Sequence, residues 1–403
     1  MAGPLEGVRV LDLSRILAGP WASQTLADLG AEVVKVERPG VGDDTRGWGP
    51  PWLADGEGRP TGESAYFLSA NRGKRSITVE FAKPEGQEVV RRLAAASDIL
   101  IENYKAGGLA RFGLDYEGLR AANPRLIYCS ITGFGQTGPY RQRAGYDFLL
   151  QAMGGLMSVT GEPDGEPMKV GVAITDILTG MYAATAVLAA LAERERSGEG
   201  QHIDLALFDV QVATLANQAM NYLVSGEEPK RLGNAHPSVV PYQAFRTADG
   251  FAVLAVGNDE QFRRFAARAG RPELAEDERF RTNAGRVRDR AALVPIVRAL
   301  MAERTTGEWL ALLEPAGVPC GPVNGLRAAF ADPQVQARAM VARLPHPLAG
   351  EVPVVASPMK FSRTRVEHGR PPPLLGEHTE AVLRDVLGSS DAEIARWRSQ
   401  GAI

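Results

Sequence analysis

Short apolar runs alternate with amphipathic segments along roughly the first third of the chain. The apolar runs have the length and composition of buried strands, and they are Val8–Leu13, Glu32–Glu37, Ser76–Phe81, Ile99–Glu102 and Arg125–Ile131. Hydrophobic residues at helical spacing lie between them, at Pro20–Leu29, Pro84–Ala96 and Tyr116–Ala122. This alternation predicts a mostly parallel sheet with helices on both faces, which is a Rossmann-like α/β fold.

A long segment with almost no charge follows between Lys169 and Glu195. After Asp176 the next charged residue is Glu193, and small residues recur between them at helical spacing. The pattern predicts a helix that is buried on most sides and has Asp176 at its first turn. From this segment alone, Asp176 is either a cap that accepts backbone N–H groups or a nucleophile that attacks an activated acyl group.

The composition of the chain changes at Gly226–Pro241, which is rich in charged residues at first and then rich in Gly and Pro. Such a segment is typical of a linker. A hairpin pattern and three helical patterns follow, and they predict a smaller α+β domain. Beyond it the chain is Pro-rich, which predicts an extended strap before two short C-terminal helices. The predicted divisions are a large domain at 1–225, a linker at 226–241, a small domain at 242–325, and a strap with helices returning to the large domain at 326–403.

Composition narrows the classes of function. The chain has 403 residues, of which 44% are hydrophobic, and a net charge of -3, without a face or arm rich in Lys and Arg. This balance argues against a nucleic-acid partner. Cys129 and Cys320 lie far apart, so neither a disulfide framework nor a metal site is expected. No basic, apolar leader is visible and no apolar run approaches ~18 residues, so we expect a cytoplasmic enzyme without a membrane partner.

Cations and amides cluster near the ends of the predicted strands, where parallel sheets bind ligands. They are Arg38, Asn71–Arg75, Asn103–Lys105 and Arg111. Each residue alone is more often a solvated surface group, but together they indicate an anionic ligand with phosphates and an adenine ring. The turn Ser14–Pro20 contains one glycine where a dinucleotide site needs three, so NAD is disfavoured although Glu37 ends the second strand.

Several motifs, in the same order along nearly the full chain, resemble the family III CoA-transferases. These motifs are Val10–Ser14 with Leu17–Pro20, Leu26–Pro39, Asn71–Ile77, Gly145–Asp147 and Gly233–Pro237. In this family the nucleophile is an aspartate in a segment like Gly171–Gly180, so the resemblance assigns that role to Asp176. The resemblance also implies a homodimer in which the two chains are interlocked.

The resemblance implies that CoA moves from an acyl-CoA thioester to a free carboxylic acid, through an anhydride and then a CoA thioester of Asp176. CoA and acyl-CoA are then substrates, and neither a permanently bound cofactor nor a metal is expected. By matching motif, the expected CoA-binding residues are Leu17, Ala18, Arg38, Asn71, Arg72, Lys74, Arg75, Asn103, Tyr104, Lys105 and Arg111.

The acyl groups are less closely defined by the sequence. Gly42–Pro51 and Gln142–Asp147 resemble family members that act on dicarboxylates, and Arg46 or Arg143 could hold the far carboxylate or serve a structural role. Tyr146 either lines the thioester site or is a core aromatic. Racemases of the family carry His at this position, so racemisation is the disfavoured alternative. Formate, oxalate, carnitine-type or aromatic acids, and a CoA-binding protein without catalysis, stay open.

Overall fold

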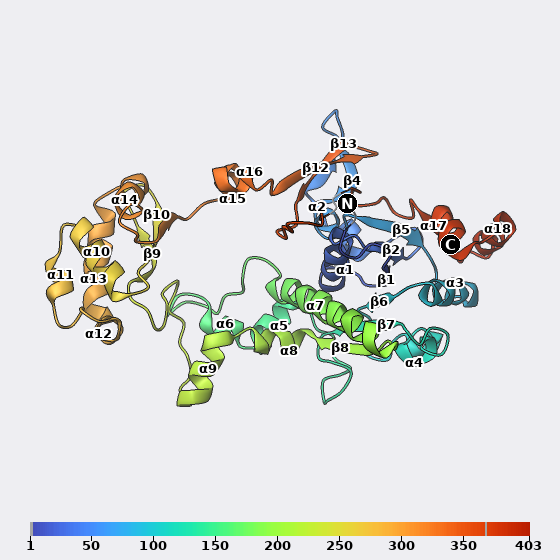
Figure 1. Cartoon of the computed structure of the whole chain (residues 1–403), viewed down its shortest axis with the longest axis horizontal. Coiled ribbons are helices and arrows are strands. Elements are labelled where there is room, and N and C mark those ends of the chain that lie inside the picture. Colours follow the sequence, from blue (N-terminus) through green and yellow to red (C-terminus); the bar gives the residue numbers. More distant parts are fainter. Residues whose placement is uncertain (1–2, 367–368) are drawn as a thin grey trace. The chain divides into compact units, whose positions relative to one another are not determined.

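The computed structural model of the protein describes residues 3–366 and 369–403, and the chain divides into two compact units (Figure 1). Three segments form the first unit, namely Met1–Leu156, Val170–Ala219 and Gln336–Ile403. The second unit consists of Met157–Lys169 and Met220–Val335. The C-terminal part of the chain therefore belongs to the same unit as the N-terminal part.

The first unit is built on a six-stranded sheet in the order β5-β2-β1-β6-β7-β8. Its strands are β1 (Arg9–Asp12), β2 (Glu32–Glu37), β5 (Lys74–Thr78), β6 (Ile99–Glu102), β7 (Ile127–Thr132) and β8 (His202–Ala206). Every pairing is parallel, and Val10 lies between Val33 of β2 and Ile99 of β6. The predicted parallel α/β sheet is therefore confirmed, and β8 adds a sixth strand to the five that the sequence predicted.

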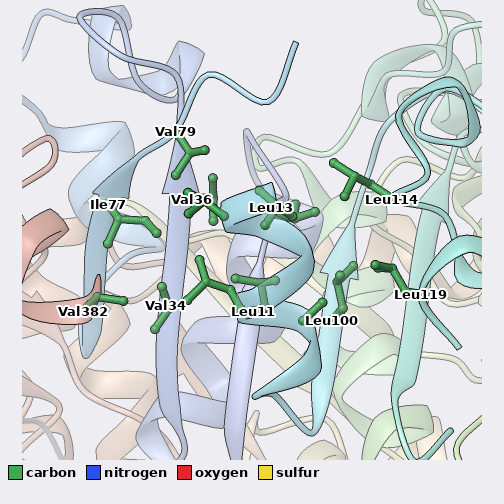
Figure 2. Close-up of a cluster of buried hydrophobic side chains, with 14 of the residues drawn as sticks. Leu11, Leu13, Val34, Val36, Ile77, Val79, Leu100, Leu114, Leu119 and Val382 are labelled. Atoms are coloured by element: carbon green, nitrogen blue, oxygen red, sulfur yellow. The ribbon is translucent and has the colours of Figure 1, made fainter. Parts of the chain in front are cut away.

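One face of this sheet packs against helices from both ends of the chain. Alternate strand residues such as Leu11, Val34 and Leu100 form a buried cluster there, and Val382 from the C-terminal part joins it (Figure 2). The helices on this face are α3 (Pro84–Ala95), α4 (Tyr116–Leu119), α17 (Thr379–Leu387) and α18 (Asp391–Ser399). Because side chains alternate between faces along a strand, the neighbouring residues point to the opposite face.

The opposite face packs against α1 (Ala18–Asp28) and α7 (Ile174–Ser197). Gly180 allows these helices to approach closely, because a Cβ atom at this position would lie 2.7 Å from the carbonyl oxygen of Ala18. The small residues of the long apolar segment thus bring the beginning of α7 to the beginning of α1. Both helix N-termini lie beside the site described below.

Helix α7 is long and apolar enough, by length and composition alone, to cross a membrane, which the sequence interpretation did not anticipate. However, 39% of its most apolar window is buried in the protein, and Ala183, Ala184 and Val187 pack onto the sheet. A core helix of a globular protein passes the same test of length and hydropathy. The exposed part of α7 carries Met181 and Tyr182.

The second unit contains the predicted hairpin, β9 (Tyr242–Arg246) and β10 (Phe251–Ala255), to which β11 (Cys320–Pro322) adds a third strand. Phe245, Phe262 and Trp309 belong to its buried core. The surrounding helices are α10 (Asp259–Arg268), α11 (Glu273–Glu276), α12 (Asn283–Arg288), α13 (Arg290–Ala302) and α14 (Thr306–Leu313).

The predicted extended strap contains regular structure instead. It begins with α15 (Leu326–Ala331) and α16 (Pro333–Ala337), followed by an antiparallel hairpin of β12 (Val341–His346) and β13 (Gly350–Val355). Val352 and Val354, two residues apart on one face of β13, pack in a small buried cluster with Leu68. Each strand contains a proline, so the alternation of buried and exposed residues did not indicate a strand in the sequence. Leu68 belongs to α2 (Ala65–Ser69), which follows a second unpredicted hairpin, β3 (Trp52–Ala54) and β4 (Pro60–Ser64).

The C-terminal part also protects the sheet edge at β5. The N–H of Gly73 donates to the Arg370 carbonyl at 3.0 Å, and the N–H of His378 donates to the Ser76 carbonyl at 2.9 Å. Just beyond β5, the N–H of Glu80 donates to the carbonyl of Ala402 at 2.8 Å. The strand therefore has partners along its outer edge, as an edge strand requires to avoid pairing with other chains.

Two further helical predictions need correction. The apolar pattern at Val210–Leu223 predicts one helix, but the structure has two, α8 (Leu207–Ala213) and α9 (Ala216–Ser225), with Ala216 at a φ of 48°. The pattern at Phe148–Leu156 also predicts one helix, but the structure has α5 (Asp147–Met153) followed by the short α6 (Leu156–Val159). In the second case the helix begins at Asp147, one residue earlier than predicted, and this residue is central to the site.

Candidate active site

A cavity of about 230 Å³ lies at the carboxyl ends of β1, β6 and β7, and Asp176 lines it. The other lining residues are 15–18, 103–106, 131–133, 141, 143–146 and 207. Several of these segments follow strands or begin helices, which is where open parallel sheets bind ligands. The structure thus brings Leu17, Ala18, Asn103, Tyr104, Lys105, Arg143 and Tyr146 together with Asp176, as the sequence predicted.

The cap of α7 is Asp147 rather than Asp176. Asp147 Oδ1 accepts the N–H of Thr175 at 2.8 Å and the N–H of Asp176 at 3.3 Å. Gln151 fixes this cap, because its Nε2 donates to Asp147 Oδ2 at 2.7 Å and its Oε1 accepts the N–H of Val170 at 2.9 Å. Asp147 therefore takes the capping role that the sequence left open for Asp176, and the nucleophilic role of Asp176 stays a prediction.

The environment of Asp176 disfavours its charged form. Burial, together with the negative charge of Asp147, raises the pKa of Asp176 to about 7. A carboxylate that is poorly solvated loses little hydration when it attacks a carbonyl carbon, so it is a better nucleophile than a surface carboxylate. The same environment makes its ionised fraction sensitive to pH near neutrality.

Positive charge surrounds the mouth of this cavity. Arg141, Arg143 and Lys105 line it, and across the described parts of the chain none of the three has a carboxylate within ion-pair distance. The guanidinium of Arg143 lies over the ring of Tyr140 at 4.5 Å from its centroid, which limits its freedom without neutralising it. Arg15 differs, because its Nη1 forms an ion pair with Asp44 at 2.7 Å. The cavity can therefore accept an anionic ligand.

A second cavity, of about 190 Å³, shares the side chains of Arg15 and Tyr104 with the first. It is lined by Arg38, as the motifs predicted, and by Val79, Glu80 and Phe81, which the sequence interpretation missed. The missed residues follow the carboxyl end of β5 as Arg38 follows that of β2. Both sets of residues thus follow the carboxyl end of a strand, whereas the predicted cluster Asn71–Arg75 lies at the other end of β5.

The predicted residues Asn71, Arg72, Lys74 and Arg75 do not line these two cavities. The side chain of Lys74 has no exposed surface, and its Nζ donates to Asp12 Oδ2 at 3.1 Å and to Asn71 Oδ1 at 2.9 Å. Arg72 forms an ion pair with Asp28, and Arg75 pairs with Glu32 and Asp385. Lys74 and Arg75 instead line a separate cavity with Arg370 and His378. Contact of these residues with CoA stays a prediction.

Two other predicted arginines also lie outside the first cavity. Arg46 donates from Nε and Nη2 to the two carboxyl oxygens of Glu37, at 2.8 Å each, and its side chain is 10% exposed. The structure thus gives Arg46 the structural role that the sequence left open. Arg111 is exposed and lies over its neighbour Phe112.

Tyr146 is 64% exposed and lines the cavity from the start of α5. The alternative that it is a core aromatic is therefore wrong. Arg15 and Ile16 line the same cavity but were missed, since the sequence gives them no distinctive pattern. Asp147 was quoted as part of a motif, yet its position in sequence does not reveal that it caps a helix 28 residues later.

Comparisons with known proteins agree with this geometry. The sequence model of CoA-transferase family III matches residues 5–379. The chain is 53% identical to succinate--glutarate CoA-transferase of Agrobacterium fabrum, over 95% of this chain and 96% of that protein. It is 48% identical to succinyl-CoA:glutarate CoA-transferase of Mus musculus, over 99% of this chain and 90% of that protein. A CAIB/BAIF family protein from Brucella suis superposes with a TM-score of 0.85 at 52% identity, covering 96% of this chain and 100% of that one.

We predict that Asp147→Asn lowers the pKa of Asp176. Asparagine keeps an oxygen that can accept the N–H groups of α7 but removes the negative charge, so ionisation of Asp176 becomes easier. The pKa should fall below 7 and stay above the usual aspartate range, because burial persists. Carboxyl ¹³C NMR of labelled aspartates, assigned with Asp176→Asn, measures it. Asp209→Asn makes the same charge change on the exposed side of α8 and should leave the pKa unchanged; an equal shift in both variants would show that the charge of Asp147 is not the specific cause.

Proposed function

Because the chain belongs to CoA-transferase family III, we propose that it transfers CoA between succinyl-CoA and glutarate, or a dicarboxylate of similar length, through covalent intermediates on Asp176. Membership of the family makes the protein a CoA-transferase. The choice of acids rests on the names of the relatives reported above. One observation carries the mechanism: Asp176 lines a cation-rich cavity while Asp147 takes the N–H groups at the start of its helix.

The proposed reaction begins when a carboxylate oxygen of Asp176 attacks the thioester carbonyl carbon of succinyl-CoA. The C–S bond breaks, CoA leaves as its thiolate, and a mixed anhydride joins Asp176 to succinate. The thiolate then attacks the carbonyl carbon of Asp176, which releases succinate and leaves CoA as a thioester of Asp176. Glutarate repeats the two steps in reverse, so that glutaryl-CoA forms and the Asp176 carboxylate is restored.

Each attack places negative charge on a carbonyl oxygen. Leu17 and Ala18, at the start of α1, line the cavity, and their N–H groups find no acceptor among the described residues. Free N–H groups at a helix start stabilise such an oxyanion in a site with little water. These groups are the donors that the mechanism requires.

The two adjoining cavities together suit a long thioester. The nucleotide part of CoA would lie in the second cavity, beside Arg38 and the segment 79–81, and its thioester end would lie in the first. Tyr104 and Arg15 line both cavities, so they would lie beside the pantetheine arm between the two ends. Lys105 and Arg38 would be near phosphate groups, which bind cations strongly.

We expect Asp176→Ala to lower CoA transfer by at least ~10³-fold, because the covalent route is then closed. After incubation of the unaltered protein with succinyl-CoA and digestion, the peptide that contains Asp176 should gain the mass of CoA minus water. Hydroxylamine should convert this adduct to a hydroxamate. Asp209→Ala should keep both activity and adduct. Transfer that survives Asp176→Ala, or solvent deuterium at the α-carbon of an acyl-CoA without transfer, would reject the proposal.

We propose that Arg143 binds the far carboxylate of the dicarboxylate. Its support is the unneutralised guanidinium at the cavity, in contrast to Arg46, which is committed to Glu37. Loss of one charge-assisted contact changes affinity by about 10- to 100-fold. Arg143→Gln should therefore raise KM for glutarate by that factor and leave KM for a monocarboxylate of equal length unchanged. Arg141→Gln is the matched control, and an equal loss in that variant would show a diffuse charge effect instead of a specific contact.

We also propose that the protein is a homodimer. The first unit exposes several large apolar side chains near the candidate site, among them Tyr146, Phe148, Val172, Met181 and Tyr182. Exposed groups of this kind are costly in water unless a partner covers them. Light scattering should therefore give about twice the chain mass of 43.2 kDa. Tyr182→Lys should lower this mass toward that of one chain, and a monomeric wild-type particle would refute the proposal.

A further inference from the structure

The backbone of Ser14–Ile16, just before α1, is held by side chains rather than by a strand or a helix. The N–H of Ser14 donates to Asp12 Oδ1 at 2.9 Å, and its carbonyl accepts Lys35 Nζ at 2.8 Å. Asn103 binds both backbone groups of Arg15, at 2.9 and 2.7 Å. The N–H of Ile16 donates to both carboxyl oxygens of Asp43, at 3.2 Å each. Hydrogen bonds from side chains therefore fix the backbone of all three residues of this turn.

Ile16 needs such support because its backbone is strained. Its φ is 71°, in the left-handed region that a β-branched residue rarely adopts. A residue of this type keeps the conformation only where its surroundings fix it. The next two residues, Leu17 and Ala18, line the cavity with Asp176. The strained residue therefore sets where the N–H groups at the start of α1 lie.

Asp43 and Lys35 form the rigid centre of this support. Lys35 Nζ lies 2.9 Å from Asp43 Oδ2, and neither side chain has exposed surface. Asp43 also accepts the N–H and the hydroxyl of Thr45, at 3.0 and 2.8 Å, and its own N–H donates to Glu37 Oε2 at 2.9 Å. A buried ion pair is a poor source of stability, since an apolar pair of the same volume often stabilises as well. The specific geometry that it imposes is a better explanation for its presence.

We propose that Asp43, fixed by Lys35, is a positioning residue for CoA transfer. It holds Ile16 in its left-handed conformation and so keeps the N–H groups of Leu17 and Ala18 beside the cavity where the carbonyl oxygen becomes negative. Asp43 lies in the wall of the second cavity, but its side chain has no exposed surface, so it acts through the groups that it holds and not by contact with substrate. This inference rests on the proposed function for its effect on turnover, but its effect on the backbone can be measured without any substrate.

The first test compares Asp43→Asn with a double variant, Asp43→Asn with Lys35→Met, which leaves no unpaired charge in the interior. In both we expect kcat to fall ~10- to 100-fold, as a misplaced catalytic group causes, while KM for succinyl-CoA changes less than about 3-fold. Amide hydrogen exchange of the peptide covering residues 13–18, followed by mass spectrometry without substrate, should become faster. A loss that appears wholly in KM, or unchanged exchange in this peptide, would overturn the inference.

The matched control is Asp98→Asn. Asp98 forms an ion pair of the same length, with Arg194 at 2.9 Å, although its side chain is 32% exposed, and it precedes β6 at the opposite end of the sheet from the cavity. This variant should keep kcat and the exchange rate at residues 13–18. If it lowers kcat as much as Asp43→Asn does, loss of any such pair suffices and the inference is wrong.

A second test uses the strain at Ile16. Glycine adopts a positive φ without cost, so Ile16→Gly should make the turn less dependent on Asp43. The variant with both Ile16→Gly and Asp43→Asn should therefore have a higher kcat than Asp43→Asn alone, although Ile16→Gly by itself gives no gain. Independent, multiplicative losses would reject the coupling. If the unaltered protein shows no CoA transfer, the proposed function fails, whereas the exchange measurement still decides the role of Asp43.

Discussion

The chemistry proposed for this protein depends on which carboxylate takes the free N–H groups at the start of α7. An aspartate in the first turn of a helix ordinarily satisfies those groups itself, and it then becomes less reactive and more acidic. Here Asp147 reaches from α5 to accept them. Asp176 consequently stays poorly solvated, and the proposed role as a nucleophile needs a carboxylate in this state. The contact between Asp147 of α5 and the start of α7 thus sets the environment of the Asp176 carboxyl group, which takes no part in that contact.

The parallel sheet makes this division of roles possible. Its six strands end on one side, and apolar clusters on both faces fix the helices that follow them. Because α1 and α7 cover the same face and Gly180 lets them approach, two helix N-termini meet at the carboxyl edge. One supplies N–H donors and the other supplies Asp176. The packing of the two helices on the sheet therefore positions the candidate site, and the conformation of no one loop does so alone.

Much of this arrangement could be predicted from sequence because it rests on local patterns. The strands at Glu32–Glu37 and Ile99–Glu102 begin and end where the apolar runs do. The family motifs contained Asp176 and several residues that line the same cavity, among them Leu17, Ala18 and Tyr146. The pattern failed where a contact joins distant segments. Asp43 and Asn103 hold the turn before α1 through hydrogen bonds to residues 27 and 88 positions away, and the spacing of hydrophobic residues does not reveal such pairs. The cations near β5 were misplaced for a related reason, since Arg72 and Lys74 form ion pairs with the buried carboxylates of Asp28 and Asp12 and do not line the two cavities near Asp176.

The bond between Glu80 and Ala402 has a consequence for how the chain tolerates proteolysis. Glu80 belongs to the short segment that lines the second cavity, and its N–H is held by a carbonyl more than three hundred residues later. Lys83 strengthens the same tie, since its Nζ donates to the carbonyl of Gln400 at 2.8 Å. Proteolytic removal of residues 400–403 would therefore remove both bonds from the segment beside the second cavity, while leaving the residues around Asp176 in place.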